Sequence, residues 1–187
     1  RLAGLRALLT ETSNPPIMLR RMKEDHLEGL PEQHKHCLRR EMPPLQAKAY
    51  DEAVQVARHG QHRRGKMLEA LHQLRAISLH PQNASEGDDD TYIRDSARLS
   101  AAFEILDRVS KDGDKALIFL ESRHMQGVLS EILQRRYGMP EPPLLINGEV
   151  SGDRRKARVD LFQKRSGFDV MILSPKAGGV GLTVTAA

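Results

Sequence analysis

The chain of 187 residues is long enough to enclose one hydrophobic core, because 39% of its residues are hydrophobic and 29% are charged. Aromatic residues make up only 4% and Trp is absent, which argues against a sugar-stacking lectin or an aromatic base-stacking platform. The single cysteine, Cys37, excludes an internal disulfide and indicates a reducing, intracellular compartment. No apolar run approaches the ~20 residues of a membrane span. The N-terminus lacks a starting Met and a signal peptide, so we expect a piece of a longer, non-membrane protein.

The first half of the chain is predicted to be mainly helical. Residues 1–9 predict the end of a helix, and apolar residues at helical spacing predict helices over residues 45–57 and 67–79. Alternating side chains over residues 34–42 predict one strand. Residues 82–91 (QNASEGDDDT) are polar and acidic, so we predict a loop that is disordered or poorly ordered.

The second half predicts an α/β fold. Three short apolar runs are typical of strands that a sheet buries on both faces, and apolar residues at helical spacing separate them. The predicted elements are a helix over residues 99–109, a strand over 116–120, a helix over 125–133 ended by Gly138 and Pro140, a strand over 144–146, a short basic helix with Val159 and Phe162 on its inner face and Ser151 or Asp153 as its cap, and a strand over 170–173. These elements make two successive β-α-β units, whose right-handed crossovers place the helices against a parallel sheet.

Positive charge is concentrated in one segment. Residues 151–165 hold six basic residues against two acidic ones, a surplus equal to the net charge of the whole chain, +4. Residues 58–66 (RHGQHRRGK) form a second basic stretch without an acidic residue. Clusters of this kind suggest a polyanionic partner, although on charge alone a solvated helix face is the favoured alternative.

Small and polar residues follow the last two predicted strands. Residues 174–181 (SPKAGGVG) come directly after one strand, and Asn147-Gly148, with Ser151 and Arg155, follow the other. Because the carboxyl ends of parallel strands meet at one edge of a sheet, glycine N–H groups, a Ser hydroxyl and an Arg fork there suit a phosphate. The glycine segment is neither a Walker A loop nor a dinucleotide fingerprint, and a tight turn without a ligand is the alternative. Two such strand ends together favour a partner with a polyphosphate backbone.

Metal and nucleophile sites are not expected. His34 and His36 would lie on the opposite strand face from Cys37, no second ligand pair is apparent, and nothing positions a base beside the Cys37 thiol. The Asp88-Asp89-Asp90 run could hold a cation, but a solvated loop is the favoured interpretation.

Five segments, in chain order, resemble blocks of the Swi/Snf-type helicase-like ATPases, a family of superfamily-two DNA translocases. They are MLRRMK at residues 18–23 with LP at 30–31, similar to LRR-K…LP; LRAI at 74–77 with HP at 80–81, similar to LR-I--HP; KALIF at 115–119, similar to the motif IV strand; NGEVS at 147–151 with Arg155 and Phe162, similar to DG---S---R…F; and ILSPKAGGVGLT at 172–183, similar to motif V, LS-KAGG-GLNL. The sequence departs from the family where Leu120-Glu121 replace the Ser-Gln after motif IV and where Thr183 replaces the Asn of motif V.

The resemblance implies an α/β fold with a RecA-like parallel sheet flanked by helices, forming an incomplete second motor lobe that is truncated before motif VI. Residues 1–41 would be the inter-lobe segment that connects it to the first lobe, and residues 42–187 the second lobe itself. Within that lobe, residues 42–110 would be mainly helical, including a helical insertion, and residues 111–187 would form the parallel α/β part.

The resemblance also implies a function, that of an ATP-dependent translocase or remodelling ATPase on double-stranded DNA. It would hold the DNA backbone without sequence specificity and would use ATP and Mg²⁺ in the full-length protein. The implied phosphate-binding residues are Gly148, Ser151, Arg155, Ser174 and Lys176, and those that couple this contact to one wall of the ATP cleft are Gly178, Gly179 and Gly181. No catalytic residue and no metal ligand is expected, because the family's Walker A, Walker B and arginine-finger residues would lie outside this chain. The chain alone would therefore bind neither ATP nor Mg²⁺ and would be inactive.

Two alternatives stay open at this stage. One is the lobe of another superfamily-two RNA or DNA helicase, against which the KAGGVG core argues, and the other is a non-catalytic nucleic-acid-binding module. The expected partners are double-stranded DNA and the first lobe of the same protein. The expected location is intracellular, in the cytoplasm or nucleoid of a bacterium or the nucleus of a eukaryote.

Overall fold

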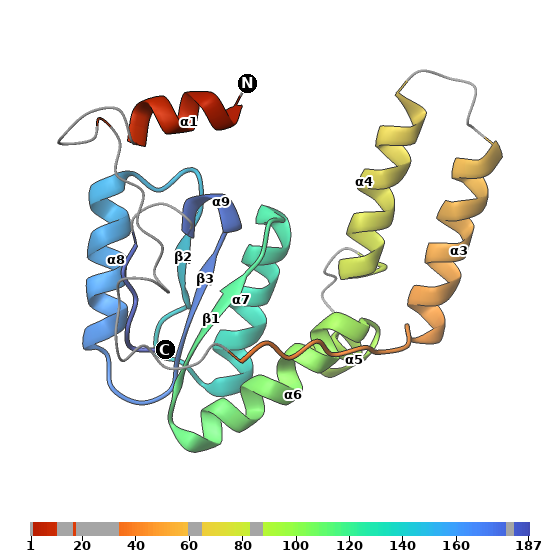
Figure 1. The fold of residues 1–187 in the computed structure, drawn as a ribbon. Helices are drawn as coiled ribbons and strands as arrows, with labels where there is room; N and C mark the ends of the chain where they lie inside the picture. The colour runs from red at the N-terminus through yellow and green to blue at the C-terminus, as the bar shows by residue number, and fades with distance from the viewer. Residues whose placement is uncertain (1, 11–16, 18–33, 60–64, 83–87, 179–181) are drawn as a thin grey trace. The chain divides into compact units, whose positions relative to one another are not determined.

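The computed structural model describes residues 2–10, 17, 34–59, 65–82, 88–178 and 182–187 (Figure 1). The chain divides into two compact units, Arg1–Cys37 and Leu38–Ala187. The first unit contains helix α1 (Leu2–Thr10), which confirms the helix predicted over residues 1–9. The motif segments at residues 18–23 and 30–31, and the residues Gly179 and Gly181, lie outside the described residues.

A three-stranded parallel sheet lies in the second unit (Figure 1). Its strands are β1 (Lys115–Phe119), β2 (Leu144–Ile146) and β3 (Asp169–Leu173), which confirm the three predicted strands. The strand order is β1-β3-β2, and all pairs are parallel. β3 is the central strand, and every one of its residues is buried because helices cover both faces of the sheet.

The predicted helices form in the second unit, and two further short helices, α5 and α9, form where no helix was predicted. They are α3 (Pro44–His59), α4 (Lys66–Leu79), α5 (Asp89–Arg94), α6 (Ala97–Asp112), α7 (Arg123–Tyr137), α8 (Gly152–Lys164) and α9 (Pro175–Gly178). Gly138 ends α7 with a φ of 59°, a left-handed conformation that glycine adopts without strain. No helix among the described residues is long and apolar enough to cross a membrane.

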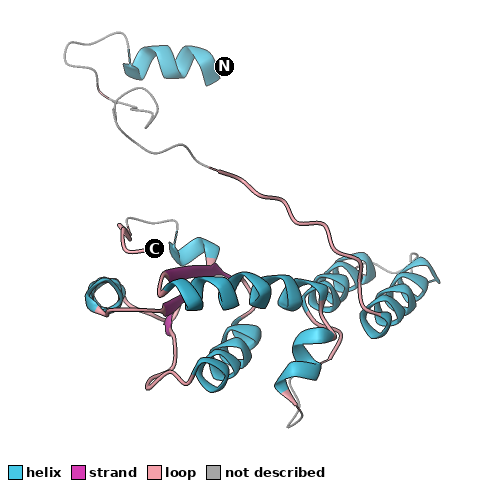
Figure 2. Ribbon diagram, turned by 90° about the horizontal axis from the view of Figure 1, so that it is seen from below, coloured by secondary structure: helices cyan, strands magenta, loops and turns pink. Residues whose placement is uncertain are grey.

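Helices lie on both sides of the sheet (Figure 2). The side chains of β3 alternate between two hydrophobic clusters, one on each face. Val170 and Ile172 pack with residues of α6 and α7, whereas Met171 and Leu173 pack with Phe162 of α8. The crossover helices α7 and α8 therefore cover opposite faces. Right-handed crossovers require this when the third strand is inserted between the first two. The prediction of a parallel sheet flanked by helices is confirmed.

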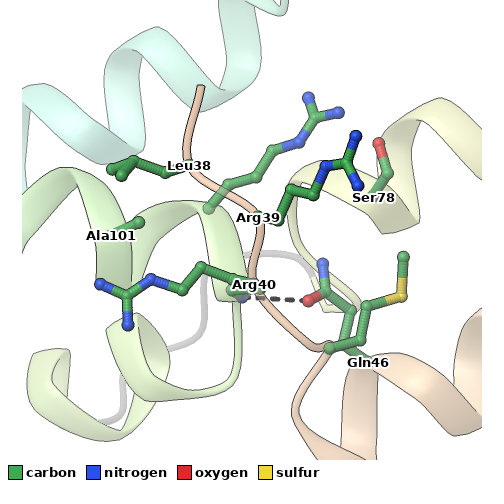
Figure 3. Close-up of a pocket in the computed structure, with 9 residues that line it drawn as sticks. Leu38, Arg39, Arg40, Gln46, Ser78 and Ala101 are labelled. Atoms are coloured by element: carbon green, nitrogen blue, oxygen red, sulfur yellow. Dashed lines mark hydrogen bonds between the residues drawn. The ribbon is translucent and has the colours of Figure 1, made fainter. Parts of the chain in front are cut away.

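The strand predicted over residues 34–42 is wrong, because the described residues 34–43 contain no strand. Residues 38–40 and Met42 instead line a cavity of about 410 Å³ together with residues of α3, α4 and α6 (Figure 3). Arg40 pairs there with Glu104 of α6, while Leu38 remains 52% exposed. An extended segment has the same two-residue alternation as a strand even when no neighbouring strand pairs with it, so the pattern could not distinguish the two.

A buried glutamine joins the α3–α4 helix pair to α6 (Figure 3). Gln46 donates from Nε2 to the carbonyl oxygen of Ile77 in α4, at 2.8 Å, and its Oε1 accepts from the N–H of Ala97, at 3.0 Å. Its side chain is only 1% exposed. One amide side chain thus connects three helices and also satisfies an N–H group in the first turn of α6.

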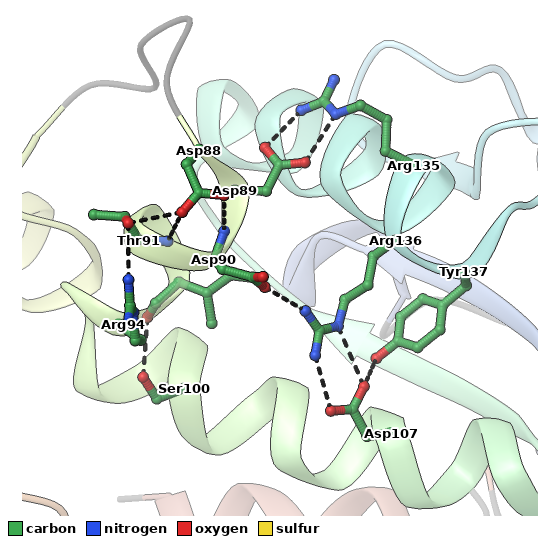
Figure 4. Close-up of polar contacts among 11 residues, drawn as sticks. Asp88, Asp89, Asp90, Thr91, Arg94, Ser100, Asp107, Arg135, Arg136 and Tyr137 are labelled. Atoms are coloured by element: carbon green, nitrogen blue, oxygen red, sulfur yellow. Dashed lines mark hydrogen bonds and ion pairs between the residues drawn. The ribbon is translucent and has the colours of Figure 1, made fainter.

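The prediction of a disordered loop is wrong for residues 88–91, and residues 83–87 lie outside the described residues. Asp88 is the N-cap of α5 and accepts a hydrogen bond from the N–H of Thr91, at 3.0 Å (Figure 4). Asp89 pairs with Arg135 at 2.9 Å, and Asp90 pairs with Arg136 at 2.7 Å. The three carboxylates are therefore favoured by the N-terminal end of one helix dipole and by two cations in the last turn of α7.

Asp107 of α6 is predicted to make stability depend on pH. Arg136 donates to Asp107 at 3.1 Å and holds the pKa of this carboxyl below its usual value, with a further hydrogen bond from Tyr137 at 2.7 Å (Figure 4). A pKa lowered by folding gives stability that is present above the unfolded pKa, near 3.9, and is lost as the pH falls through the folded pKa.

We expect Asp107→Asn to lower the free energy of unfolding at pH 7 by about 1 kcal/mol, because the partly exposed ion pair and its hydrogen bonds are weakened. Urea unfolding at pH 7 and at pH 3 tests this, and the difference from the unaltered chain should shrink at pH 3. Asp112→Asn, at the end of the same helix, is the matched control. A difference that is the same at both pH values would contradict the expectation.

Candidate nucleic-acid interface

The three loops that follow the strands begin at one edge of the sheet. The N–H of Leu120 donates to the carbonyl oxygen of Leu173, at 2.9 Å, and the N–H of Ser174 donates to that of Ile146, at 2.8 Å. These bonds continue the strand pairing by one residue beyond the ends of β1 and β3. The residues after β1, β2 and β3 are therefore held at this carboxyl edge.

A cavity of about 490 Å³ opens at the carboxyl edge, and we call it the rim cavity. All three loops contribute to its lining, which consists of Glu121, Arg123, Asn147, Gly148, Arg155, Ser174, Pro175, Lys176 and Ala177. The structure thus brings together four of the predicted phosphate-binding residues, namely Gly148, Arg155, Ser174 and Lys176. An edge of this kind is where open α/β sheets bind ligands.

The other predicted residues are placed less directly. Ser151 is the N-cap of α8 but does not line the rim cavity, and its hydroxyl makes no capping hydrogen bond. Gly178 is the last residue of the short helix α9. Gly179 and Gly181 lie outside the described residues, so their coupling role stays a prediction from the sequence.

Arg155 fixes the loop between β2 and α8. Its Nε donates to the carbonyl oxygen of Val150 at 2.7 Å, and one terminal nitrogen donates to that of Asn147 at 3.5 Å. A guanidinium has five N–H groups, so others remain to donate to a ligand in the cavity. Above Gly148 the space is open, since a Cβ placed there would meet no atom within 4 Å.

Gln126 of α7 is a site residue that the sequence analysis missed. Its side chain is 1% exposed, its Nε2 donates to the carbonyl oxygen of Leu120 at 2.7 Å, and its Oε1 accepts from Nδ2 of Asn147 at 3.2 Å. It therefore links the loop after β1 to the loop after β2. The available signal was an amide directly after Met125 on a helix whose buried face is mainly apolar.

Ser174 and Lys176 follow β3. The hydroxyl oxygen of Ser174 accepts a hydrogen bond from the N–H of Ala177 at 3.3 Å, so it caps the first turn after the strand. Lys176 is exposed, and the buried Ala177 packs into the hydrophobic cluster under α8. Burial of Ala177 directs the backbone of this turn, and Lys176 remains accessible to an anion at the rim.

The basic residues of segment 151–165 fall into two groups, one with structural contacts and one exposed to solvent. Arg158 donates to the carbonyl oxygen of Leu145, and Arg165 pairs with Glu141 and with the buried Asp169. These two cations therefore stabilise the fold. Arg154 and Lys156 are exposed on α8, as a solvated helix face or a polyanion contact would both require.

Two ion pairs lie at the carboxyl edge. Arg123, in the first turn of α7, pairs with Glu149 in the loop after β2. Arg75 of α4 pairs with Glu121, which follows β1, at 3.6 Å. All four side chains are more than 60% exposed, so both pairs are open to exchange with ions or ligands in solution.

Comparison with curated proteins identifies relatives along nearly the whole chain, although no family model matches. YwqA of Bacillus subtilis, a candidate ATP-dependent helicase/translocase, is 30% identical over 184 residues, which cover 92% of this chain and 19% of YwqA. The Zorya protein ZorD of Escherichia coli is 31% identical over 202 residues, which cover 100% of this chain and 18% of ZorD. The chain thus spans less than a fifth of the length of these two relatives.

Solved structures show the same fold. The C-terminal domain of a Sulfolobus solfataricus SWI2/SNF2 ATPase has a TM-score of 0.65 at 27% identity, over 78% of this chain and 65% of that domain. The C-terminal part of the Fun30 ATPase domain has a TM-score of 0.64 at 19% identity, over 84% of this chain and 74% of that chain, and supports the fold alone. The chain therefore belongs to the Swi2/Snf2-type family of helicase-like ATPases and has the RecA-like fold of their C-terminal lobe.

Proposed function

We propose that this lobe holds the phosphate backbone of double-stranded DNA at the rim cavity, as part of an ATP-driven translocase or remodelling ATPase. The observation that carries the proposal is that the helices that follow the three strands place Arg123, Arg155 and Lys176 around one cavity, together with the open backbone at Gly148. Guanidinium, ammonium and free N–H groups are the donors that phosphate oxygens accept.

The chemistry of the rim suits a motor rather than a sequence reader. Contacts to phosphates are the same at every base pair, so a protein that moves along DNA can release one set and bind the next. Gln126 and Arg155 would hold the loops in place while Lys176 and Arg123 make the exposed contacts. Lobe closure in the parent protein would then move the held backbone, with Gly178, Gly179 and Gly181 facing the ATP cleft.

ATP and Mg²⁺ would be held mainly by the first lobe of the parent protein. The sequence contains no Gly-Lys-Ser/Thr loop to cradle phosphates. Among the described residues, no group of three or more His, Cys, Asp or Glu is placed to hold a metal ion. The proposed contribution of this chain is therefore one wall of the cleft and the DNA contact.

Binding of the 187-residue chain to a fluorescent duplex, followed by anisotropy over a salt series, tests the proposal. We expect weak binding without sequence preference and a log–log salt slope of about −3 to −4, as for about four phosphate contacts. Lys176→Ala should weaken binding to all duplexes equally and flatten the slope by about one unit. Arg155→Ala should have at least that effect, because it also releases the loop carbonyls.

Lys111→Ala is the matched control, because Lys111 lies near the end of α6 before β1 begins, at the opposite edge of the sheet. It should leave the slope nearly unchanged. Affinity that does not depend on salt, or strong discrimination between duplex sequences, would contradict phosphate binding. Tighter binding to an RNA duplex than to DNA would favour the helicase alternative.

A further inference from the structure

The ion pair between Arg123 and Glu149 lies beside the rim cavity and has no evident structural purpose. Arg123 lines the cavity, and Glu149 follows Gly148 in the loop after β2. The two side chains are 65% and 69% exposed, and exposed pairs of this kind add little to stability. Arg155 and Gln126 already fix the same loop through its backbone and through Asn147.

A carboxylate and a phosphate present similar oxygen pairs to a guanidinium. Arg binds either one through N–H···O bonds. Each backbone phosphate carries one negative charge, as the carboxylate does, and the neighbouring phosphates of DNA add to the negative potential that attracts the guanidinium. Glu149 therefore occupies Arg123 in the way that a phosphate oxygen would. Because the pair is solvent-exposed, a backbone phosphate that enters the cavity can displace the carboxylate without opening the fold.

We infer that Glu149 is an internal competitor for the phosphate contact of Arg123: it pairs with Arg123 until DNA displaces it. The inference rests on the proposed function of the rim cavity. It makes the loop after β2 both a contributor to the DNA contact, through Gly148, and a limit on its strength, through Glu149. A motor must release DNA in every cycle. Release becomes easier when Glu149 pairs with Arg123 as soon as the phosphate leaves it.

The neighbouring loop repeats this arrangement. Glu121 lines the rim cavity and also an adjoining cavity of about 690 Å³, and it pairs with Arg75 of α4 at 3.6 Å. His124 and Arg98 line the adjoining cavity as well. Two loops at the carboxyl edge thus each place a glutamate against an exposed arginine, and each pair lies beside a cavity that basic side chains line. The repetition supports competition at the rim rather than a chance surface pair.

A double-mutant cycle on duplex DNA binding tests the inference. Glu149→Gln should tighten binding roughly three- to ten-fold at low salt and steepen the salt slope by about one unit, because one more cation becomes available to a phosphate. In the Arg123→Ala background, the same change should give no more than the small gain expected from net charge. Glu131→Gln is the matched control. Glu131 lies in α7 eight residues after Arg123, and its replacement makes the same charge change and breaks an exposed pair with Arg135.

The outcomes separate the inference from the proposed function. If Lys176→Ala weakens binding but Glu149→Gln behaves like Glu131→Gln, or its gain survives in the Arg123→Ala background, the competitor role is refuted and phosphate binding stands. If the unaltered chain binds no duplex, both fail. Far-ultraviolet circular dichroism and thermal unfolding of each variant show whether the fold is intact, which these exposed substitutions should preserve.

Discussion

ATP hydrolysis by the purified 187-residue chain is expected to stay at the background rate, with or without double-stranded DNA. Phosphoryl transfer needs a cradle for the phosphates, a held Mg²⁺, a positioned water and a cation at the developing charge. The one Asp-Glu pair in the sequence, Asp51-Glu52, lies within α3 and not at the end of an apolar strand. An arginine finger alone contributes ~10³–10⁵ in rate, and no segment of the chain matches that motif. Phosphate release measured at saturating ATP checks the expectation.

The full-length parent protein is the comparison for this measurement, and there we expect turnover that DNA stimulates. Replacing Gly178 and Gly179 by Val in the parent should abolish the stimulation, because side chains would obstruct the approach of the backbone that the family resemblance implies. Gly127→Ala, within α7, is a control for a glycine change elsewhere. ATPase activity that stays with the pure 187-residue chain through successive purification steps would contradict the assignment of the chain as a second lobe.

Replacing Gln126 by Leu is expected to lower the free energy of unfolding by about 2–3 kcal/mol and to weaken DNA binding at the same time. The substitution leaves the carbonyl oxygen of Leu120 and the side-chain amide of Asn147 without their partner, and each lost partner costs ~1–3 kcal/mol when the group is buried. The two loops that Gln126 connects would then move independently. Urea unfolding and duplex anisotropy on the same samples measure both effects.

Gln134→Leu, two turns further along α7, is the matched control. It makes the same change in volume and polarity, and it should alter neither quantity by a comparable amount. Gln126→Leu with unchanged stability would show that water replaces the lost partners. Reduced stability with unchanged DNA affinity would show that the loop positions do not depend on this link.

Sequence reasoning predicted the parallel α/β half well because its signals are local. A buried strand such as β3 is a continuous apolar run, and α6 and α7 place apolar residues at helical spacing. The same reasoning brought Gly148, Arg155, Ser174 and Lys176 to one edge, because all parallel strands of a sheet end on the same side. None of this required knowledge of which strand lies beside which.

What the sequence did not predict depends on contacts between distant residues. Asp88 to Asp90 form the start of a helix because Arg135 and Arg136 lie opposite them, and composition alone indicated a loop. The Arg155 side chain looked like a ligand contact, whereas part of it is used by loop carbonyls that the sequence does not place. Gln126 belongs to no sequence motif, because its partners lie in two loops, one after β1 and one after β2.

The strand order has a consequence for how the chain folds. In the sheet that the described residues form, β3 separates β1 from β2 and is the last of the three in the sequence, so neither can pair with β3 before residues 169–173 are available. A ribosome-bound chain that ends after β2 still lacks the strand that pairs with both β1 and β2. The sheet therefore assembles late, when β3 pairs with both strands and closes the long segments between them. We expect slow folding, and a chain that is vulnerable to aggregation during synthesis.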